Sequence, residues 1–319
     1  MIFNMKLISI IVPIYNEKEN IPLFFEEFLK INEKLKDNYS FELIFVNDGS
    51  TDSSIDELYK IEDDNKNNIN IKILDFARNF GKEIALTAGI ENASGDACLM
   101  IDADLQHPIE LVPDFIAKWE EGFDIVVGIR KNNKGEGIIK KFGSKLYYSI
   151  MNKISDTKIT PRATDFRIID KSVIEAFLKF TERKRMTRAL IDWLGFKKEY
   201  IYFSANPRKF GQPSYNVIKL IKLALNSFVS HSLFPLKITG YLGTFITVFF
   251  GGFGLFVFIG RYFTNNSFAL SFTGPALLAI FNAFLIGIVL SSLGLIALYI
   301  ANIENEVKNR PLYIIRKRR

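Results

Sequence analysis

The chain has 319 residues, of which 48% are hydrophobic, 24% are charged and 14% are aromatic. This length allows one large domain or two smaller ones, and the composition excludes both a disordered chain and a protein made only of membrane helices. A single cysteine and two histidines exclude a disulfide framework and argue against a thiolate- or histidine-rich metal site. The net charge of +6 fits an anionic partner such as nucleic acid, anionic lipid or a phosphate-bearing substrate.

The chain up to residue 235 alternates between short apolar runs and amphipathic stretches. The apolar runs are rich in β-branched residues, which is typical of buried parallel strands. We expect strands at 7–14, 42–46, 71–76, 97–101 and 124–128, and helices at 20–36, 53–63, 82–92 and 109–120. This alternation predicts a doubly wound α/β domain, in which ligands bind at the carboxyl ends of the strands.

The following part of the chain is strongly apolar. Residues 238–303 contain one charged residue, Arg261, and two stretches, 238–260 and 277–300, are long enough to cross a ~30 Å hydrocarbon layer. A buried helical hairpin is the alternative, but neither stretch has a polar face. Residues 215–234 predict an amphipathic helix in the membrane interface or, alternatively, a core helix of the soluble domain. Basic residues flank the apolar region on both sides, which places both termini in the cytoplasm.

Polar residues follow four of the expected strands, and the acidic pair Asp102 and Asp104 is the sharpest of these signals. Residues two apart in an extended segment point the same way, so the two carboxylates can share a divalent cation such as Mg²⁺ or Mn²⁺. Gln106 can add an amide oxygen. Such a cation would neutralise a diphosphate leaving group. Helix capping is the alternative for each polar residue, but it does not explain why carboxylates recur at one edge of the sheet.

Several spaced motifs together resemble a known family. The segments 9–17 (SIIVPIYNE), 46–52 (VNDGSTD) and 102–104 (DAD) resemble glycosyltransferase family 2. The motifs 79–82 (NFGK), 102–108 (DADLQHP), 164–167 (TDFR) and Arg208-x-x-Gly211 are similar to those of the polyisoprenyl-phosphate glycosyltransferases. That branch includes dolichol-phosphate mannose synthases and bacterial undecaprenyl-phosphate sugar transferases.

The resemblance implies a fold and a domain layout. We expect a catalytic domain of GT-A type, with a doubly wound mixed sheet, at residues 1–214 and an amphipathic juxtamembrane region at 215–235. Two transmembrane helices at 236–303 and a basic cytoplasmic tail at 304–319 complete the layout. A homo-oligomer such as a tetramer is implied by the resemblance alone.

The resemblance also implies roles for individual residues. The nucleotide-binding positions are Pro13, Tyr15, Glu17, Asp48, Lys82, Asp102, Ala103 and Asp104. The metal and diphosphate site is formed by Asp102, Asp104 and Gln106, and Asp165 matches the catalytic carboxylate. The acceptor-phosphate positions are Arg130, Lys140, Lys141, Ser144 and Arg208. A basic face against anionic lipid is an equal alternative for Lys140 and Lys141, and the basic run at 183–188 is expected to face lipid headgroups.

These expectations combine into one predicted activity. It is the inverting, metal-dependent transfer of one sugar from a nucleotide sugar to a polyprenyl phosphate, such as undecaprenyl phosphate, at the cytoplasmic face of the cell membrane. UDP-glucose and UDP-N-acetylglucosamine are the donors implied by resemblance, and the product would serve cell-envelope glycosylation. The basic charge is then assigned to phosphate and lipid rather than to nucleic acid. A processive polysaccharide synthase is an alternative, but it usually carries a Gln-x-x-Arg-Trp segment and more spans. A non-catalytic, membrane-anchored nucleotide-binding protein is the other alternative.

Overall fold

A computed structural model of the chain describes residues 5–65, 69–131, 160, 162–183, 185–206 and 309–317, with scattered positions between 274 and 308. The chain divides into two compact units. One contains Met1–Lys153, Thr157–Ser214 and Arg310–Arg319, and the other contains Ile154–Asp156 and Tyr215–Asn309.

The predicted interfacial helix and first membrane span lie outside the described residues. Most of the second span lies outside them too, and its described positions are helical. Among the residues that the structure describes, no helix is both long enough and apolar enough to span a bilayer.

The first unit contains a seven-stranded mixed sheet with strand order β3-β2-β1-β4-β6-β5-β7. The strands are β1 (Lys6–Ile14), β2 (Tyr39–Asn47), β3 (Asn70–Asp75), β4 (Ala97–Met100), β5 (Ile125–Arg130), β6 (Ala163–Asp170) and β7 (Lys198–Phe203). All neighbouring pairs are parallel except those of β6, which runs antiparallel to β4 and β5. The mixed sheet and its first five strands confirm the prediction, whereas β6 and β7 are strands that the sequence pattern did not reveal.

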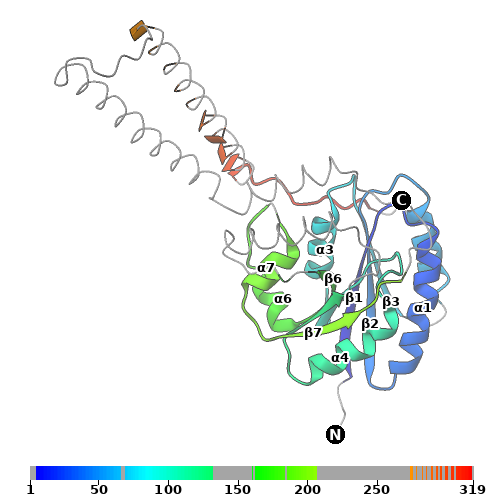
Figure 1. Ribbon diagram of the computed structural model, residues 1–319. Coiled ribbons are helices and arrows are strands. Elements are labelled where there is room, and N and C mark those ends of the chain that lie inside the picture. The colour runs from blue at the N-terminus through cyan, green and yellow to red at the C-terminus, as the bar shows by residue number, and fades with distance from the viewer. Residues whose placement is uncertain are drawn as a thin grey trace. The chain divides into compact units, whose positions relative to one another are not determined.

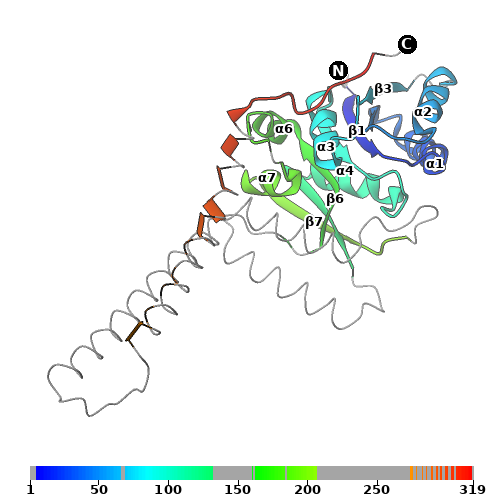
Figure 2. The ribbon, with the colours of Figure 1, turned by 90° about the horizontal axis from the view of Figure 1, so that it is seen from above.

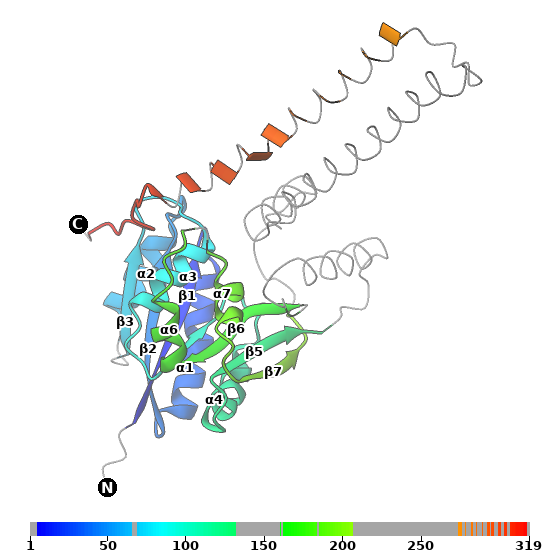
Figure 3. The same ribbon diagram turned by 90° about the vertical axis from the view of Figure 1, so that its left-hand side faces the viewer.

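Helices cover both faces of this sheet (Figure 1, and Figure 3 from the side). They are α1 (Asn20–Leu35), α2 (Ser54–Asp63), α3 (Lys82–Glu91), α4 (Val112–Glu120), α6 (Lys171–Phe177) and α7 (Thr187–Trp193), with a 3-10 turn, η1 (Ile109–Leu111), before α4. The predicted helices at 20–36, 53–63, 82–92 and 109–120 are therefore confirmed, apart from this 3-10 turn.

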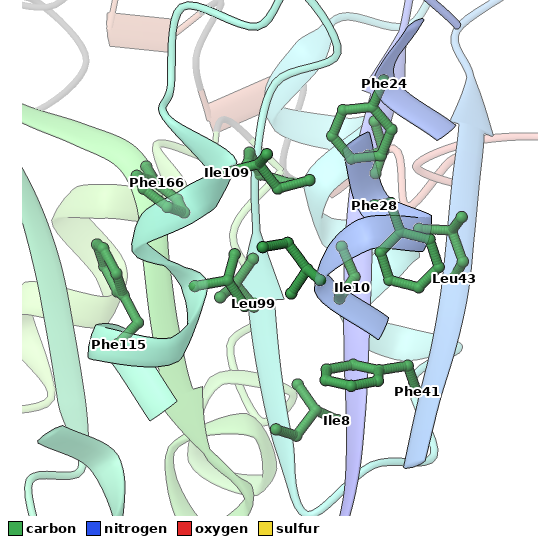
Figure 4. Close-up of a cluster of buried hydrophobic side chains, with 14 of the residues drawn as sticks. Ile8, Ile10, Phe24, Phe28, Phe41, Leu43, Leu99, Ile109, Phe115 and Phe166 are labelled. Atoms are coloured by element: carbon green, nitrogen blue, oxygen red, sulfur yellow. The ribbon is translucent and has the colours of Figure 1, made fainter. Parts of the chain in front are cut away.

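The alternation of β1 explains the two layers. Ile8 and Ile10 face one core, where they pack with Phe24 and Phe28 of α1 (Figure 4). Ile11 points to the opposite core, which α3, α6 and α7 cover. Each of these side chains is essentially fully buried, and burying an aliphatic or aromatic side chain contributes about 1.5–3 kcal/mol to stability. The sheet is thus held rigid from both sides, and its loops are free to carry polar residues.

The mixed topology brings two distant segments to one edge of the sheet. β1, β2, β3 and β4 are parallel, so their carboxyl ends meet at the same edge, called the carboxyl edge below. Because β6 is antiparallel to β4, its first residues lie at that edge as well. Residues after Met100 and residues around Asp165 therefore meet, although they are far apart in the sequence.

Candidate active site

The loops that follow β1 and β2 are joined by side-chain hydrogen bonds at the carboxyl edge. The Asn16 side-chain oxygen accepts the amide of Thr51 at 2.8 Å, and the hydroxyl of Ser50 accepts the amide of Asn16 at 3.0 Å. Asn16 has a φ of 56°, a left-handed conformation that asparagine tolerates. Tyr15, a predicted nucleotide contact, is 47% exposed beside Asn16. Its ring is therefore accessible to a ligand at this edge.

Asp48 is buried after β2 and binds the backbone at the start of α3. Its Oδ1 accepts the amide of Phe80 at 2.7 Å, and its Oδ2 accepts the amide of Gly81 at 3.0 Å. Burial raises the pKa of Asp48, and these two hydrogen bonds offset part of that rise. A carboxylate at a helix N-terminus is also favoured by the helix dipole. Asp48 thus fixes the segment that leads to Lys82, while its contact with a nucleotide stays a prediction.

Lys82 begins α3 and joins two carboxylates from different strands. Its Nζ lies 2.5 Å from Oδ1 of Asp102 and 2.8 Å from Oδ2 of Asp165. In the β4–β6 pair Met100 lies opposite Arg167, and continuing this register by two residues places Asp102 opposite Asp165. Burial alone would lower the pKa of Lys82, but the two carboxylates raise it. Lys82 is therefore an ammonium ion held between them.

Asp165 is nearly buried, with 12% of its side chain exposed, and lies within reach of three cations. In addition to Lys82, the Nε of Arg188 lies 3.1 Å from its Oδ1, and the charge of Arg167 acts on it from the same strand. Burial alone would raise the pKa of Asp165, but these cations hold it well below the usual range of a carboxyl group. Asp165 consequently remains ionised at any physiological pH.

Arg167 is a buried cation whose hydrogen-bonding capacity is incompletely used. Its side chain is 1% exposed, and its Nη2 donates to the carbonyl of Thr164 at 3.0 Å. Its Nε and Nη1 have no hydrogen-bond acceptor among the residues that the structure describes. Leaving buried donors unpaired costs stability, so such groups are uncommon outside functional sites. Arg167 thus places a positive charge near Asp165, and its donors without acceptors lower the stability of the fold.

The acidic pair Asp102 and Asp104 lies in a turn. β4 ends at Met100, and Leu105 has a φ of 57°, which turns the chain back. Asp104 is buried, and its Oδ1 accepts the amide of Gln106 at 3.1 Å. The segment that the prediction took as extended is therefore a turn, and a cation shared by the two carboxylates stays a prediction.

His107 packs behind this turn. Its ring stacks on Phe166, with centroids 5.3 Å apart, and meets the ring of Phe203 edge-on at 5.8 Å. Its Nδ1 accepts the amide of Asp102 at 3.3 Å, which assigns the ring proton to Nε2. Burial lowers the pKa of His107, so the imidazole is neutral. His107 therefore supports the Asp102 turn from behind.

The donor set of the turn suits a hard divalent cation. Among the described residues, no group of three or more histidine, cysteine or acidic side chains is arranged to hold a metal. Two carboxylates, from Asp102 and Asp104, are the kind of ligand that Mg²⁺ and Mn²⁺ prefer, with water and phosphate oxygens completing the shell. The Asp102 side chain is 26% exposed, and its Oδ2 lies 3.8 Å from the Nδ1 of His107, which is itself an acceptor. Because Nδ1 donates no hydrogen bond to Oδ2 of Asp102, this oxygen is available to a cation.

The other predicted site residues fall into two groups. Pro13 lies near the end of β1, and Glu17 lies in the loop after that strand. Ala103 is buried in the Asp102 turn, and half-buried Arg130 ends β5. Four predicted acceptor residues lie outside the described residues: Lys140, Lys141, Ser144 and Arg208.

The basic run at 183–188 departs from its prediction. The Arg185 side chain is 5% exposed and donates to the carbonyls of Phe180 and Glu182. Arg188 is directed at Asp165 and donates to the carbonyl of Ala163 at 3.1 Å. The expected contact with lipid headgroups is therefore wrong for Arg185, whereas for Arg188, 41% exposed on its side chain, it stays a prediction. Arg188 is a site residue that sequence reasoning missed, because its position depends on how α7 packs against α3.

Comparisons with known proteins identify the family of this chain. The sequence profile of the glycosyl transferase family 2 matches residues 9–178. An uncharacterized glycosyltransferase from Synechocystis is 39% identical over 97% of this chain and 94% of its own length. A prophage-derived bactoprenol glucosyl transferase from Shigella flexneri is 36% identical over 97% of both chains.

A solved structure gives a weaker likeness. The mannosyl-3-phosphoglycerate synthase from Rubrobacter xylanophilus is 15% identical, with a TM-score of 0.49 over 69% of this chain and 70% of that one. The profile match and the full-length relatives do not depend on this likeness. With its buried carboxylates at the carboxyl edge of a mixed sheet, the chain is a glycosyltransferase and belongs to family 2.

Proposed function

We propose that the protein transfers a single sugar from a nucleotide sugar to a polyprenyl phosphate at the cytoplasmic face of the membrane. The observation that carries the proposal is the meeting of Asp102 and Asp165 on the ammonium of Lys82. This arrangement puts a candidate metal ligand and a candidate catalytic carboxylate in one site, in a chain 36% identical to a bactoprenol glucosyl transferase. UDP-glucose is the first donor to test because of that relative, and UDP-N-acetylglucosamine is the second.

The donor would bind along the carboxyl edge. Tyr15 offers an exposed ring for the base, and Lys82 offers a positive charge for the diphosphate. Asp102 and Asp104 would hold Mg²⁺ or Mn²⁺, which offsets the charge of the departing diphosphate. Lys82 would then move from Asp102 towards the phosphates, because a cation and an ammonium ion compete for one carboxylate.

The acceptor is suited to this chemistry. A lipid phosphate has a second pKa of about 6, so a large share of it is dianionic at neutral pH. A phosphate oxygen attacks the anomeric carbon of the sugar, the bond from that carbon to the diphosphate breaks, and the configuration inverts. Because the dianion carries no proton, the reaction needs no strong base.

Asp165 is better suited to an electrostatic role than to accepting a proton. Its pKa is held low by Lys82, Arg167 and Arg188, so it takes up a proton poorly. A fixed carboxylate can instead orient the acceptor and offset the positive charge that develops on the sugar. Arg188, 41% exposed on its side chain, is placed to meet the incoming phosphate.

The test uses the purified full-length chain in detergent with undecaprenyl phosphate and Mg²⁺ or Mn²⁺. Radiolabelled UDP-glucose and UDP-N-acetylglucosamine are compared, and products are separated by thin-layer chromatography. We expect one labelled lipid that carries one sugar and disappears when EDTA is added. A ladder of longer products would instead indicate a polysaccharide synthase. No transfer from any nucleotide sugar, in a protein that still binds nucleotide, would indicate a non-catalytic binding protein.

A further inference from the structure

The C-terminal tail, residues 310–317, belongs to the α/β unit although it follows the second unit in the chain. It lies beside the carboxyl end of β3, which is an edge strand of the sheet, and beside the residues that follow this strand (Figure 2). The amide of Ala77 donates to the carbonyl of Ile314 at 2.8 Å, and the amide of Arg316 donates to the carbonyl of Asp75 at 2.7 Å. These bonds flank an antiparallel bridge between Phe76 and Ile315. The tail therefore pairs with backbone groups that an edge strand leaves unpaired.

Side chains strengthen this pairing. The ring of Tyr313 stacks on that of Phe76, with centroids 5.0 Å apart and planes 17° apart. Its hydroxyl donates to Glu91 at the end of α3, at 2.7 Å, and burial together with Glu91 raises the pKa of Tyr313 to about 12. The guanidinium of Arg316 donates to the carbonyl of Ala77 at 2.6 Å. The tail thus contacts β3, the loop after it and α3.

The loop that the tail contacts also supports the nucleotide side of the site. The amide of Phe76 donates to the carbonyl of Asn47 at 2.9 Å, and the Asn47 side chain donates to Asp75 at 2.7 Å. Further along the same loop, Phe80 and Gly81 donate their amides to Asp48.

The β2 loop packs closely on this segment. Gly49, with a φ of +63°, lies so close that a Cβ there would be 2.3 Å from the carbonyl carbon of Arg78. Residues 75–81 are therefore bound by the β2 loop as well as by the tail, and they lead directly into Lys82.

We propose that Tyr313 and Arg316 are positioning residues for the donor nucleotide. They hold residues 75–81 in the shape that Asp48 and Lys82 require, although neither touches the reacting groups. This inference rests on the proposed function, because it assigns the supported edge to the nucleotide.

The test removes the tail and separates binding from chemistry. A chain shortened to end at Leu312 is compared with the intact chain for donor KM, kcat and UDP affinity. We expect donor KM and the UDP dissociation constant to rise about tenfold, since two backbone hydrogen bonds and one aromatic contact are lost, while kcat stays within about twofold. Unchanged donor KM and UDP affinity would overturn the inference.

Point variants keep the test decisive if the shortened chain does not fold. Arg316→Ala should raise donor KM about threefold, since its ion pair with Asp75 is long and exposed but its bond to Ala77 is short. Lys317→Ala removes the same charge from the next, exposed position and should change nothing. Equal effects of the two substitutions would mean that only net charge matters, which contradicts a positioning role.

Hydrogen exchange separates this inference from the proposed function. In Arg316→Ala the amides of Ala77, Phe80 and Gly81 should exchange faster than in the intact chain, while the amides of β6 keep their protection. This measurement needs no substrate. If the intact chain transfers no sugar, the proposed function fails, and exchange at these amides still decides whether the tail holds the segment. Unchanged exchange at all three would show that it does not.

Discussion

Two carboxylates of the same sheet, buried Glu42 and nearly buried Asp165, show how differently a protein can surround a charge. Glu42 is 0% exposed on β2, where its Oε1 accepts the hydroxyl of Ser9 and the amide of Ser94, both at 2.5 Å. Its Oε2 lies 2.8 Å from the ammonium of Lys72. One carboxylate thus has one cation and two neutral donors, and the cluster is closed.

Asp165 lies in the opposite kind of environment. Lys82 and Arg188 both make ion pairs with it, and its Oδ1, like the Oε2 of Glu42, is a buried atom without a well-aligned hydrogen bond. Arg167 adds a third charge and leaves two donors unpaired among the described residues. Lys82 and Arg188 are more than 40% exposed, so the cluster is open to solvent on one side.

The difference is the one expected between a structural charge and a charge at a binding site. A closed cluster contributes to folding and has nothing left to offer a ligand. An open cluster whose cations are partly exposed can pair with an anionic substrate. Nucleotide diphosphates and lipid phosphates are such substrates. The comparison predicts that substitutions at Asp165 act on catalysis and that substitutions at Glu42 act on stability.

The largest effect is expected at Asp165. Asp165→Asn keeps the shape but removes the negative charge, so sugar transfer should fall about 10³-fold, within the range for a positioned catalytic carboxyl. UDP affinity measured by calorimetry should stay within about threefold of the intact chain.

A matched control for this substitution is Asp192→Asn. Asp192 is also nearly buried and pairs with Lys198 at 2.7 Å on α7, and its charge acts on Arg167, whereas Asp165 pairs directly with Lys82 and Arg188. Both variants should melt at similar temperatures. Equal loss of transfer in the two, at similar melting temperatures, would mean that the effect is not specific to Asp165.

Glu42→Gln should have the next largest effect, on stability. It leaves Lys72 without its partner and should cost about 2–3 kcal/mol of unfolding free energy at neutral pH, with UDP affinity unchanged. Burial alone would raise the pKa of Glu42, but Lys72, Ser9 and the Ser94 amide lower it overall.

The pH dependence follows from this direction. A folded-state pKa below that of the unfolded chain gives stability above the unfolded value, about 4.3, which is lost as pH falls through the folded value. The difference between Glu42→Gln and the intact chain, measured by denaturant titration, should therefore shrink below pH 4.3. A difference that stays constant down to pH 3 would contradict the ionised pair.

Arg167→Met should move stability and transfer in opposite directions. Replacing an incompletely satisfied buried cation by an apolar side chain of similar length should leave stability unchanged or raise it by about 1 kcal/mol. Transfer should fall about tenfold, because Asp165 loses part of its positive surroundings. Melting temperature and kcat measured on one preparation test both halves. A variant that is both less stable and less active would make Arg167 a structural residue.

Much of the fold could be predicted because β1 to β5 are bounded apolar runs. β6 could not, since its face towards α3 carries Asp165 and Arg167, which break the apolar pattern. β7 has a lysine, a glutamate and two tyrosines, a composition that a strand at the edge of a sheet tolerates. The strands that sequence reasoning missed are thus the one bearing the catalytic candidate and one at an edge.

The candidate site, like β6 and β7, could be predicted only in part from local sequence patterns. Asp102, Lys82 and Asp165 were each indicated by a motif, but their meeting depends on the antiparallel placement of β6, which no local pattern encodes. Arg188 looked like part of a basic surface, because its partner Asp165 is distant in sequence. The tail around Tyr313 looked like a basic end of the chain, because pairing with an edge strand needs only backbone groups.

The smallest effect is expected at Glu120, which makes the comparison quantitative. Its carboxylate lies 2.8 Å from the Nζ of Lys6, the same distance as in the Glu42–Lys72 pair, but both side chains are about one-third to one-half exposed. Glu120→Gln is the same chemical change as Glu42→Gln and leaves Lys6 over the ring of Trp119. Exposed pairs contribute about 0–1 kcal/mol, because water stabilises the two separate charges almost as well as the ion pair does. Denaturant titration of the two variants side by side should therefore give a clearly larger loss for Glu42→Gln. Equal losses would mean that distance between the charges, rather than their burial, decides what a carboxylate does in this sheet.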